Sequence, residues 1–207
     1  MSTTRRIVCG LVIALTVALA LPAAAQEPIG RVERQQGVVT VQRAGVPSAL
    51  SIGALVYMGD SLTTGPRSRI RLVFEDGSTL AVGPDTHVTL DAQRVGAGGS
   101  LRGVFNLLRG IVRTVLSADQ TGGNVSVFTR AAIASVRSTD WIVEAEAGHT
   151  AVFVVDGAVN VRSTQDITAG VVLGPGDGTD VDVGEAPTPP VQWGAPRRAD
   201  VLARTRL

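Results

Sequence analysis

The chain has 207 residues, and its 19 basic residues, all of them arginine, nearly balance 18 acidic residues. This near-neutral, scattered charge argues against nucleic acid as a partner, because nucleic-acid binding needs a clustered basic surface. The single cysteine, Cys9, lies in the first ten residues, so the remaining chain has no thiol for a disulfide or a nucleophile.

The first 25 residues are typical of a secretory signal peptide. Arg5 and Arg6 precede the uncharged run Ile7–Leu21, and a stretch of alanines ends at Ala25. The run is shorter than the roughly 20 apolar residues that a membrane span needs. Cleavage between Ala25 and Gln26 would leave 207 − 25 = 182 residues, with 17 basic against 18 acidic side chains. We expect one periplasmic or secreted domain without a stable membrane span; an uncleaved leader that tethers a sensor is the alternative.

Residues 69–90 are patterned as short strands. Every second residue, Ile70, Leu72 and Phe74, is apolar, which predicts one buried strand face. The other face carries Arg69, Arg71 and Glu75. Asp76-Gly77 then favours a two-residue hairpin turn, because glycine supplies the positive φ that such a turn needs. The same buried face continues through Leu80, Val82, Val88 and Leu90.

The second half of the chain repeats this pattern. Trp141, Val143 and Ala145 are expected to point inward along one strand, and Asp156-Gly157 marks a later turn. Short strands separated by close turn signals indicate an all-β fold. Few or no helices are expected apart from the signal peptide and the tail.

A weak internal repeat suggests duplicated β units. The segment around Gly37, QGVVTVQR, is similar to DGAVNVRS around Gly157, 120 residues later. Gly59-Asp60 has a counterpart 117 residues later in Gly176-Asp177. Duplication would give stacked units in a sandwich or a short solenoid. Independent use of the same turn residues is the other explanation.

Two segments are harder to predict. In residues 94–124 the apolar residues have helical spacing, but Gly103 and Gly110 each disfavour a helix interior by about 1 kcal/mol. A helix and two strands bent at these glycines are both compatible with the pattern. Residues 185–207 are proline-rich at their start, and we expect a tether with one short helical turn that lies either against the domain or beyond it.

Three stretches resemble the FecR domain: GVVTVQRAG, LVFEDGSTLAVGPDTHVTL and VFTRAAIASVRSTDWIVEAEAGHTAVFVVDGAVNV. The resemblance covers residues 30–162, within a domain expected over residues 26–184. The chain departs from the family pattern at Arg130, where proline is common, at Ser138, where glycine is usual, and at Trp141, where phenylalanine is usual. The positions taken as the structural motif are Gly59, Asp60, Asp76, Gly77, Ser78, Arg137, Thr139, Trp141, Asp156 and Gly157.

The resemblance implies a β-rich interaction domain outside the cytosol. In signalling members this domain lies in the periplasm behind a membrane span, and a cytosolic N-terminal segment controls a sigma factor. Six residues precede the apolar run here, so we do not expect this chain to carry that segment. The resemblance then leaves a sensing or scaffolding module that binds another envelope protein or a surface polymer.

Reactive centres have little support in the sequence. His87 and His149 lie apart without metal-ligand spacing, and the chain shows no nucleophile motif, so we expect no cofactor, no metal and no enzymatic activity. An envelope enzyme on a β scaffold remains the alternative function.

The acidic residues beside glycines could be explained in two ways. Asp60, Asp76, Asp156 and Asp177 could bind calcium, but an aspartate that accepts hydrogen bonds from turn amides is the simpler interpretation. Similarly, residues 137–141 are expected to form a corner of the core rather than a ligand contact.

Within that corner, Thr139 could bond to a neighbouring backbone. Arg137 could pair with Asp140 or with Glu144.

Overall fold

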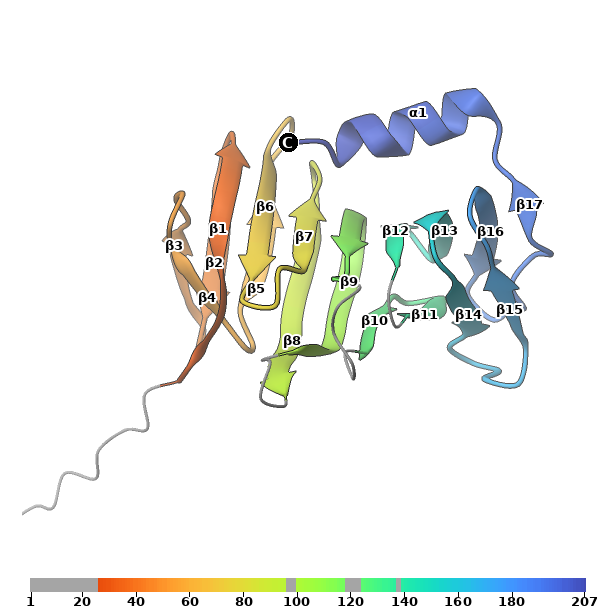
Figure 1. Cartoon of the computed structure of the whole chain (residues 1–207), viewed down its shortest axis with the longest axis horizontal. Helices are drawn as coiled ribbons and strands as arrows, with labels where there is room; N and C mark the ends of the chain where they lie inside the picture. The colour runs from red at the N-terminus through yellow and green to blue at the C-terminus, as the bar shows by residue number, and fades with distance from the viewer. Residues whose placement is uncertain (1–25, 96–99, 118–123, 137–138) are drawn as a thin grey trace, which may run out of the picture.

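The computed structural model describes residues 26–95, 100–117, 124–136 and 139–207. These residues form 17 strands and one helix, α1 (Figure 1), which confirms the all-β prediction. In this part of the chain, no helix combines the length and the apolar content that crossing a bilayer would require. The expected cleavage site falls at the edge of the described chain, with Gln26 inside it and Ala25 outside it.

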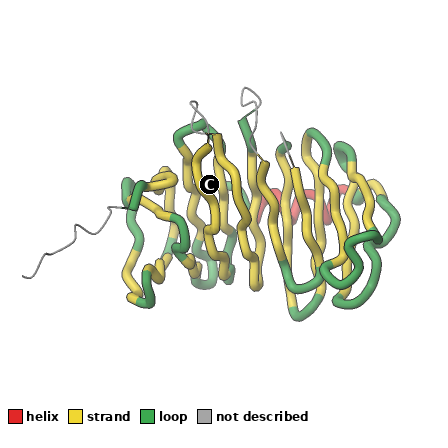
Figure 2. Tube along the Cα trace, turned by 90° about the horizontal axis from the view of Figure 1, so that it is seen from below, coloured by secondary structure: helices red, strands yellow, loops and turns green. Residues whose placement is uncertain are grey.

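The strands form two sheets that share the long strand β9 (Ser100–Val115). In spatial order, sheet A contains β4 (Leu55–Tyr57), β1 (Pro28–Gln36), β6 (Arg69–Phe74), β7 (Thr79–Val82), the C-terminal part of β9, β12 (Asp140–Glu146), β13 (His149–Asp156), β16 (Asp177–Asp182) and β17 (Val191–Gln192). Sheet B contains β3 (Val46–Ala49), β2 (Val39–Arg43), β5 (Ser61–Thr64), β8 (His87–Val95), the N-terminal part of β9, β10 (Asn124–Phe128), β11 (Ala132–Val136), β14 (Val159–Ser163) and β15 (Gly170–Leu173). The strands lie side by side along one elongated body (Figure 2).

The core lies between the two sheets. Ile70, Leu72 and Phe74 of β6 are buried, and Arg71 and Val73 between them are only partly buried, as the alternation predicts. Phe74 of sheet A stacks on Phe105 of sheet B with ring centroids 6.1 Å apart. Each such side chain contributes about 1.5–3 kcal/mol on burial, so the inner face holds the sheets together.

Strand β9 passes from one sheet to the other at Gly110. Its residues before Gly110 pair with β8 and β10, and those from Gly110 onward pair with β12. Gly110 has a φ of 95°, and a Cβ there would lie 2.2 Å from Thr86 Oγ1. Thr86 Oγ1 also accepts the backbone N–H of Ile111 at 3.0 Å, which holds the bend. Of the two alternatives for this segment, the strand is therefore correct, and only glycine fits its bend.

The turn at Asp76-Gly77 has three residues in its loop instead of the expected two. Phe74 N–H donates to Ser78 O, and Gly77 N–H donates to Phe74 O. Gly77 has a φ of 80°, and within the loop Glu75–Gly77 it alone has a positive φ. The loop is a type I turn followed by a left-handed glycine, the usual form of a three-residue hairpin.

The repeated sequence segments adopt similar turns. Gly37 and Gly157, with φ values of 73° and 89°, each connect a strand of sheet A to a strand of sheet B. Asp60 accepts the N–H of Tyr57 at 2.9 Å, and Asp177 accepts that of Gly174 at 3.0 Å, both three residues upstream. The repeat therefore extends to the local structure of these turns, which favours duplicated β units.

The C-terminal residues lie against the domain, which was one of the two expected positions, and their helix of 10 residues is longer than the single turn expected. Helix α1 (Ala195–Arg204) has a proline in its first turn and lies along the outer face of sheet A (Figure 1). We refer to residues 191–207 as the C-terminal strap.

Candidate functional site

The turn at Gly59 and Asp60 connects strands near one edge of the molecule. Asp60 is fully buried, and Arg43 forms two hydrogen bonds to its carboxylate, each 2.7 Å long. This hydrogen bonding raises the pKa of Arg43. Arg43 also lies over the Tyr57 ring, 4.1 Å from its centroid. The Asp60 carboxylate thus bonds to groups of the protein itself, which is a structural role.

The turn at residues 76–78 has the same character. Asp76 accepts the backbone N–H of Ser78 at 2.9 Å, as expected for an aspartate in a turn. Ser78 is buried, and its hydroxyl oxygen accepts the N–H of Ser117 at 3.2 Å. The Ser78 side chain therefore holds the hairpin against the residues that follow β9.

The expected corner at residues 137–141 is partly described. Thr139 donates a hydrogen bond to Ala158 O at 3.1 Å, and Trp141 is buried in the core. Asp156 lies at the exposed end of β13, directly before Gly157. Arg137 lies outside the described residues, so its role stays a prediction.

The acids expected to pair with Arg137 have other partners. Asp140 accepts hydrogen bonds from Arg113 at 2.8 and 2.6 Å, and Glu144 pairs with Arg204 of α1. The sequence pointed to a local partner for Asp140, whereas the pairing of β12 with β9 places Arg113 within hydrogen-bond distance of it. The alternation along β12 suggested that Glu144 is solvated. Instead, its side chain contacts Arg204 of the strap.

The strap is anchored by one aromatic contact. Trp193 is 5% exposed and stacks on Phe153 of β13 with a centroid distance of 5.1 Å. It also lies against Gly178 of β16, where a Cβ would be 2.1 Å from the indole Nε1. Val201 adds a second buried side chain from α1, so the strap covers an apolar part of sheet A.

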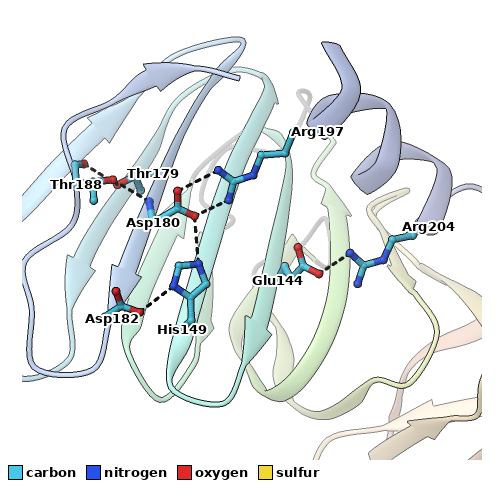
Figure 3. Close-up of polar contacts among 8 residues, drawn as sticks. All are labelled: Glu144, His149, Thr179, Asp180, Asp182, Thr188, Arg197 and Arg204. Atoms are coloured by element: carbon cyan, nitrogen blue, oxygen red, sulfur yellow. Dashed lines mark hydrogen bonds and ion pairs between the residues drawn. The ribbon is translucent and has the colours of Figure 1, made fainter. Parts of the chain in front are cut away.

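Charged residues lie beside this anchor. Arg197 of α1 lies 3.6 Å above the Trp193 ring. Arg197 also donates to Asp180 at 3.0 Å (Figure 3). Asp180 in turn lies 3.3 Å from His149 Nε2, and His149 Nδ1 lies 2.8 Å from Asp182. The helix, β13 and β16 are thereby connected through one chain of ion pairs.

This arrangement shifts two pKa values. The hydrogen bond to Asp182 and the charges of Asp180 and Asp182 raise the pKa of His149 despite partial burial. Burial alone would raise the pKa of Asp180, but its contacts with Arg197 and His149 outweigh burial and lower it. Asp180 thus holds Arg197 of the strap, and His149 links Asp180 to Asp182.

Metal binding is not supported at either histidine. Over the described ranges, no three His, Cys, Asp or Glu side chains are placed to hold a metal ion. His87 lies within hydrogen-bond distance of the Ser61 and Thr63 hydroxyls, at 3.2 and 2.9 Å. Its neighbours are therefore strand hydroxyls rather than further metal ligands.

The outer face of sheet B carries a shallow groove. A row of residues crosses four paired strands there: Ser126, Ser135, Asn160 and Val172. Two adjoining hollows of about 440 and 390 Å³ share Asn160 and Val172 in their lining. Hydroxyl and amide groups beside exposed valine suit contacts with a polypeptide, because the polar groups can form hydrogen bonds and the valine can contact apolar side chains.

Sequence reasoning missed both the strap and the groove. The buried pair Trp193 and Val201, eight residues apart within a charged segment, was a signal for a docked strap. No comparable signal exists for the groove, because its residues come from four strands whose register is set by the fold.

Comparisons with known proteins agree with this architecture. The family model described as FecR protein matches residues 60–160. Two crystal structures of a candidate anti-sigma factor from Parabacteroides distasonis ATCC 8503, at 1.65 and 2.50 Å resolution, have TM-scores of 0.55 and 0.54 with 17% sequence identity. Each match covers 69% of this chain and 64% or 63% of the other, so the likeness concerns the fold of part of that protein. A search of curated proteins finds no match.

The strand pattern, the turns and the family match agree on the central part of the molecule. Its β6–β7 hairpin holds the DGS residues of the second quoted stretch, and its β12–β14 segment holds the third quoted stretch from Trp141 onward. The chain therefore contains a FecR domain, as the resemblance of its sequence indicated.

Proposed function

We propose that this chain is a non-enzymatic binding module of the cell envelope that acts like the sensing part of FecR-type regulators. The observation that carries the proposal is the FecR match over residues 60–160. The structural likeness to a candidate anti-sigma factor agrees with a regulatory role for the fold, although that protein is longer than the matched part.

The proposed location outside the cytosol rests on the leader. Arg5, Arg6 and the apolar run Ile7–Leu21 match the n-region and h-region of a signal peptide. N-terminal sequencing of the chain from its own cells should begin at Gln26, and cell fractionation should find it outside the inner membrane. A sequence beginning at Met1 would instead support a tethered sensor.

The proposed recognition surface is the groove on sheet B. Its polar row can accept a protein partner, whereas the strap already covers the outer face of sheet A. An envelope protein is the favoured partner, because hydroxyl, amide and backbone groups match those of a polypeptide. A surface polymer would bind through the same groove and is an outcome of the test.

A pull-down with matched variants tests this proposal. Asn160→Tyr places a bulky, uncharged side chain in the groove, and Ala199→Tyr places the same side chain on the exposed face of α1. The wild-type chain and Ala199→Tyr should recover the same envelope protein, and Asn160→Tyr should lose it. Equal recovery by all three chains, or loss with Ala199→Tyr alone, would overturn the proposed surface.

A further inference from the structure

The two sheets end in four edge strands, and three of them are protected against further pairing. Strand β3 contains Pro47, and β17 has only two residues and follows Pro189 and Pro190. On β4, the Arg43 guanidinium donates to Leu55 O at 3.1 Å. Proline, short length and a charged side chain over the edge are all known ways to prevent edge pairing. Strand β15 has four residues and contains neither a proline nor a charged residue.

The backbone of β15 presents free positions at regular spacing. Ser163 N–H donates to Ala169 O, and the same register pairs Val161 with Val171. Hydrogen-bonded pairs alternate in an antiparallel ladder, so the N–H and C=O groups of Gly170 and Val172 point away from β14. A neighbouring strand could therefore bond to these two residues without disturbing the existing ladder.

The edge strand itself carries no charged residue, and the nearest charged side chain, Arg162 of β14, donates to Asn160 at 3.1 Å. From Thr168 to Gly176 the sequence TAGVVLGPG has no charged residue. Val172 is 64% exposed, and Ile167 before the strand is 61% exposed. Charged residues at an exposed edge oppose self-pairing, because identical charges meet when two copies approach. Their absence from this segment permits such an approach.

We propose that β15 pairs antiparallel with β15 of a second copy of this chain. The two-fold axis passes beside Val171, so that Gly170 of each copy faces Val172 of the other and four backbone hydrogen bonds form. Val172 then lies opposite a glycine, beside the aliphatic part of Arg162 that packs against Gly170. The half-buried Val171, which already packs on the core, meets its own copy and extends the core across the interface.

This pairing is independent of the proposed function, because it uses the free edge and leaves the identity of the envelope partner open. It would join sheet B of two copies into one continuous sheet. A partner peptide on the same edge is the competing occupant, and the experiment separates the two.

Sedimentation velocity of the chain, purified as its cells produce it, tests the proposal. An interface of this small size should give a dimer with a Kd of about 1–100 μM. Val172→Pro removes one outward N–H and should weaken dimerisation at least about tenfold. Ala49→Pro, which removes an outward N–H from the guarded edge β3, should leave the dimer unchanged.

Circular dichroism checks that the variants fold. If Val172→Pro unfolds, Val172→Lys serves in its place, because it keeps the backbone and puts like charges across the two-fold axis. Val172→Thr is the conservative control that should still dimerise. A wild-type chain that stays monomeric at about 100 μM, or a folded Val172→Pro or Val172→Lys that dimerises like wild type, overturns the proposal. A monomer that pairs with a foreign peptide at β15 also overturns it.

Discussion

The outer faces of the two sheets differ in what lies on them. On sheet A, Ala151 and Phe153 of β13 point outward and are still buried, because Trp193 and Val201 of the strap pack on them. On sheet B, a groove lies above Ser135 and Asn160 on the outward face of β11 and β14, and the described part of the chain leaves it open. The outward residues thus show which face the chain covers itself and which face is available to a partner.

The largest expected effect comes from removing the anchor of the strap. Trp193→Ala should lower the free energy of unfolding by about 3 kcal/mol, because it removes the Phe153 stack and leaves a cavity beside Gly178. Urea unfolding followed by circular dichroism measures the change. Val191→Ala, at an exposed position of the same strap, should change stability by less than about 0.5 kcal/mol. Equal effects would mean that the strap does not cover sheet A.

A smaller effect is expected from the ion pair at the end of α1. Glu144→Gln should cost about 1 kcal/mol, because both Glu144 and Arg204 are partly exposed and solvent screens the charge. Glu146→Gln, two residues along the same strand and exposed, should be close to neutral. The difference between the two variants, measured by urea unfolding, isolates the contact with the strap. A larger loss with Glu146→Gln would contradict it.

His149 should make the attachment of the strap depend weakly on pH. Its pKa is raised in the folded state by Asp182 and Asp180. The other charged groups nearby are Arg197, which donates to Asp180, and Glu146, which lies opposite His149 on β12. A raised pKa stabilises the fold below the unfolded-state value of about 6.5, and the gain is lost as pH rises through the folded value.

The comparison with His149→Gln tests this sign. Wild type should exceed the variant in stability by more at pH 5.5 than at pH 8.5, both of which are chosen to lie about one unit or more from 6.5. The gain should be small, since 44% of the His149 side chain is exposed. A difference that grows toward high pH would contradict the prediction.

The smallest effect is expected on the open face. Asn160→Tyr should change the free energy of unfolding by no more than about 0.5 kcal/mol, because the groove has space above Asn160. Thermal unfolding, read by circular dichroism, measures this. A loss of several degrees would mean that the groove is part of the packed structure, and the pull-down with this variant would lose its meaning.

Local pattern predicted much of the fold. The alternation of Ile70, Leu72 and Phe74 placed one strand face correctly, and Trp141, Val143 and Ala145 are buried as expected. Alternation did not predict that Ile142 is also buried. It is buried because the strap covers its side of β12. The uninterrupted apolar run from Ala151 to Val155 carried the information that β13 is covered on both faces.

The rest depends on contacts between distant parts of the chain. Gly110 could mean a broken helix or a bent strand, and only pairing with β12 decides between them. Arg113 and Asp140 are 27 residues apart, so the ion pair follows from register rather than from spacing. Asn160 and Val172 line one groove because β14 pairs with β15, and neither residue signals a site by itself.

Photo-crosslinking in living cells tests the contrast between the two faces most directly. A photoreactive residue is placed at Asn160 in the groove, and separately at Ala199 on the exposed face of α1. We expect a discrete adduct with an envelope protein from position 160 and no such adduct from position 199. Adducts from position 199 alone, or none from either position, would contradict the assignment of the open face of sheet B to a partner.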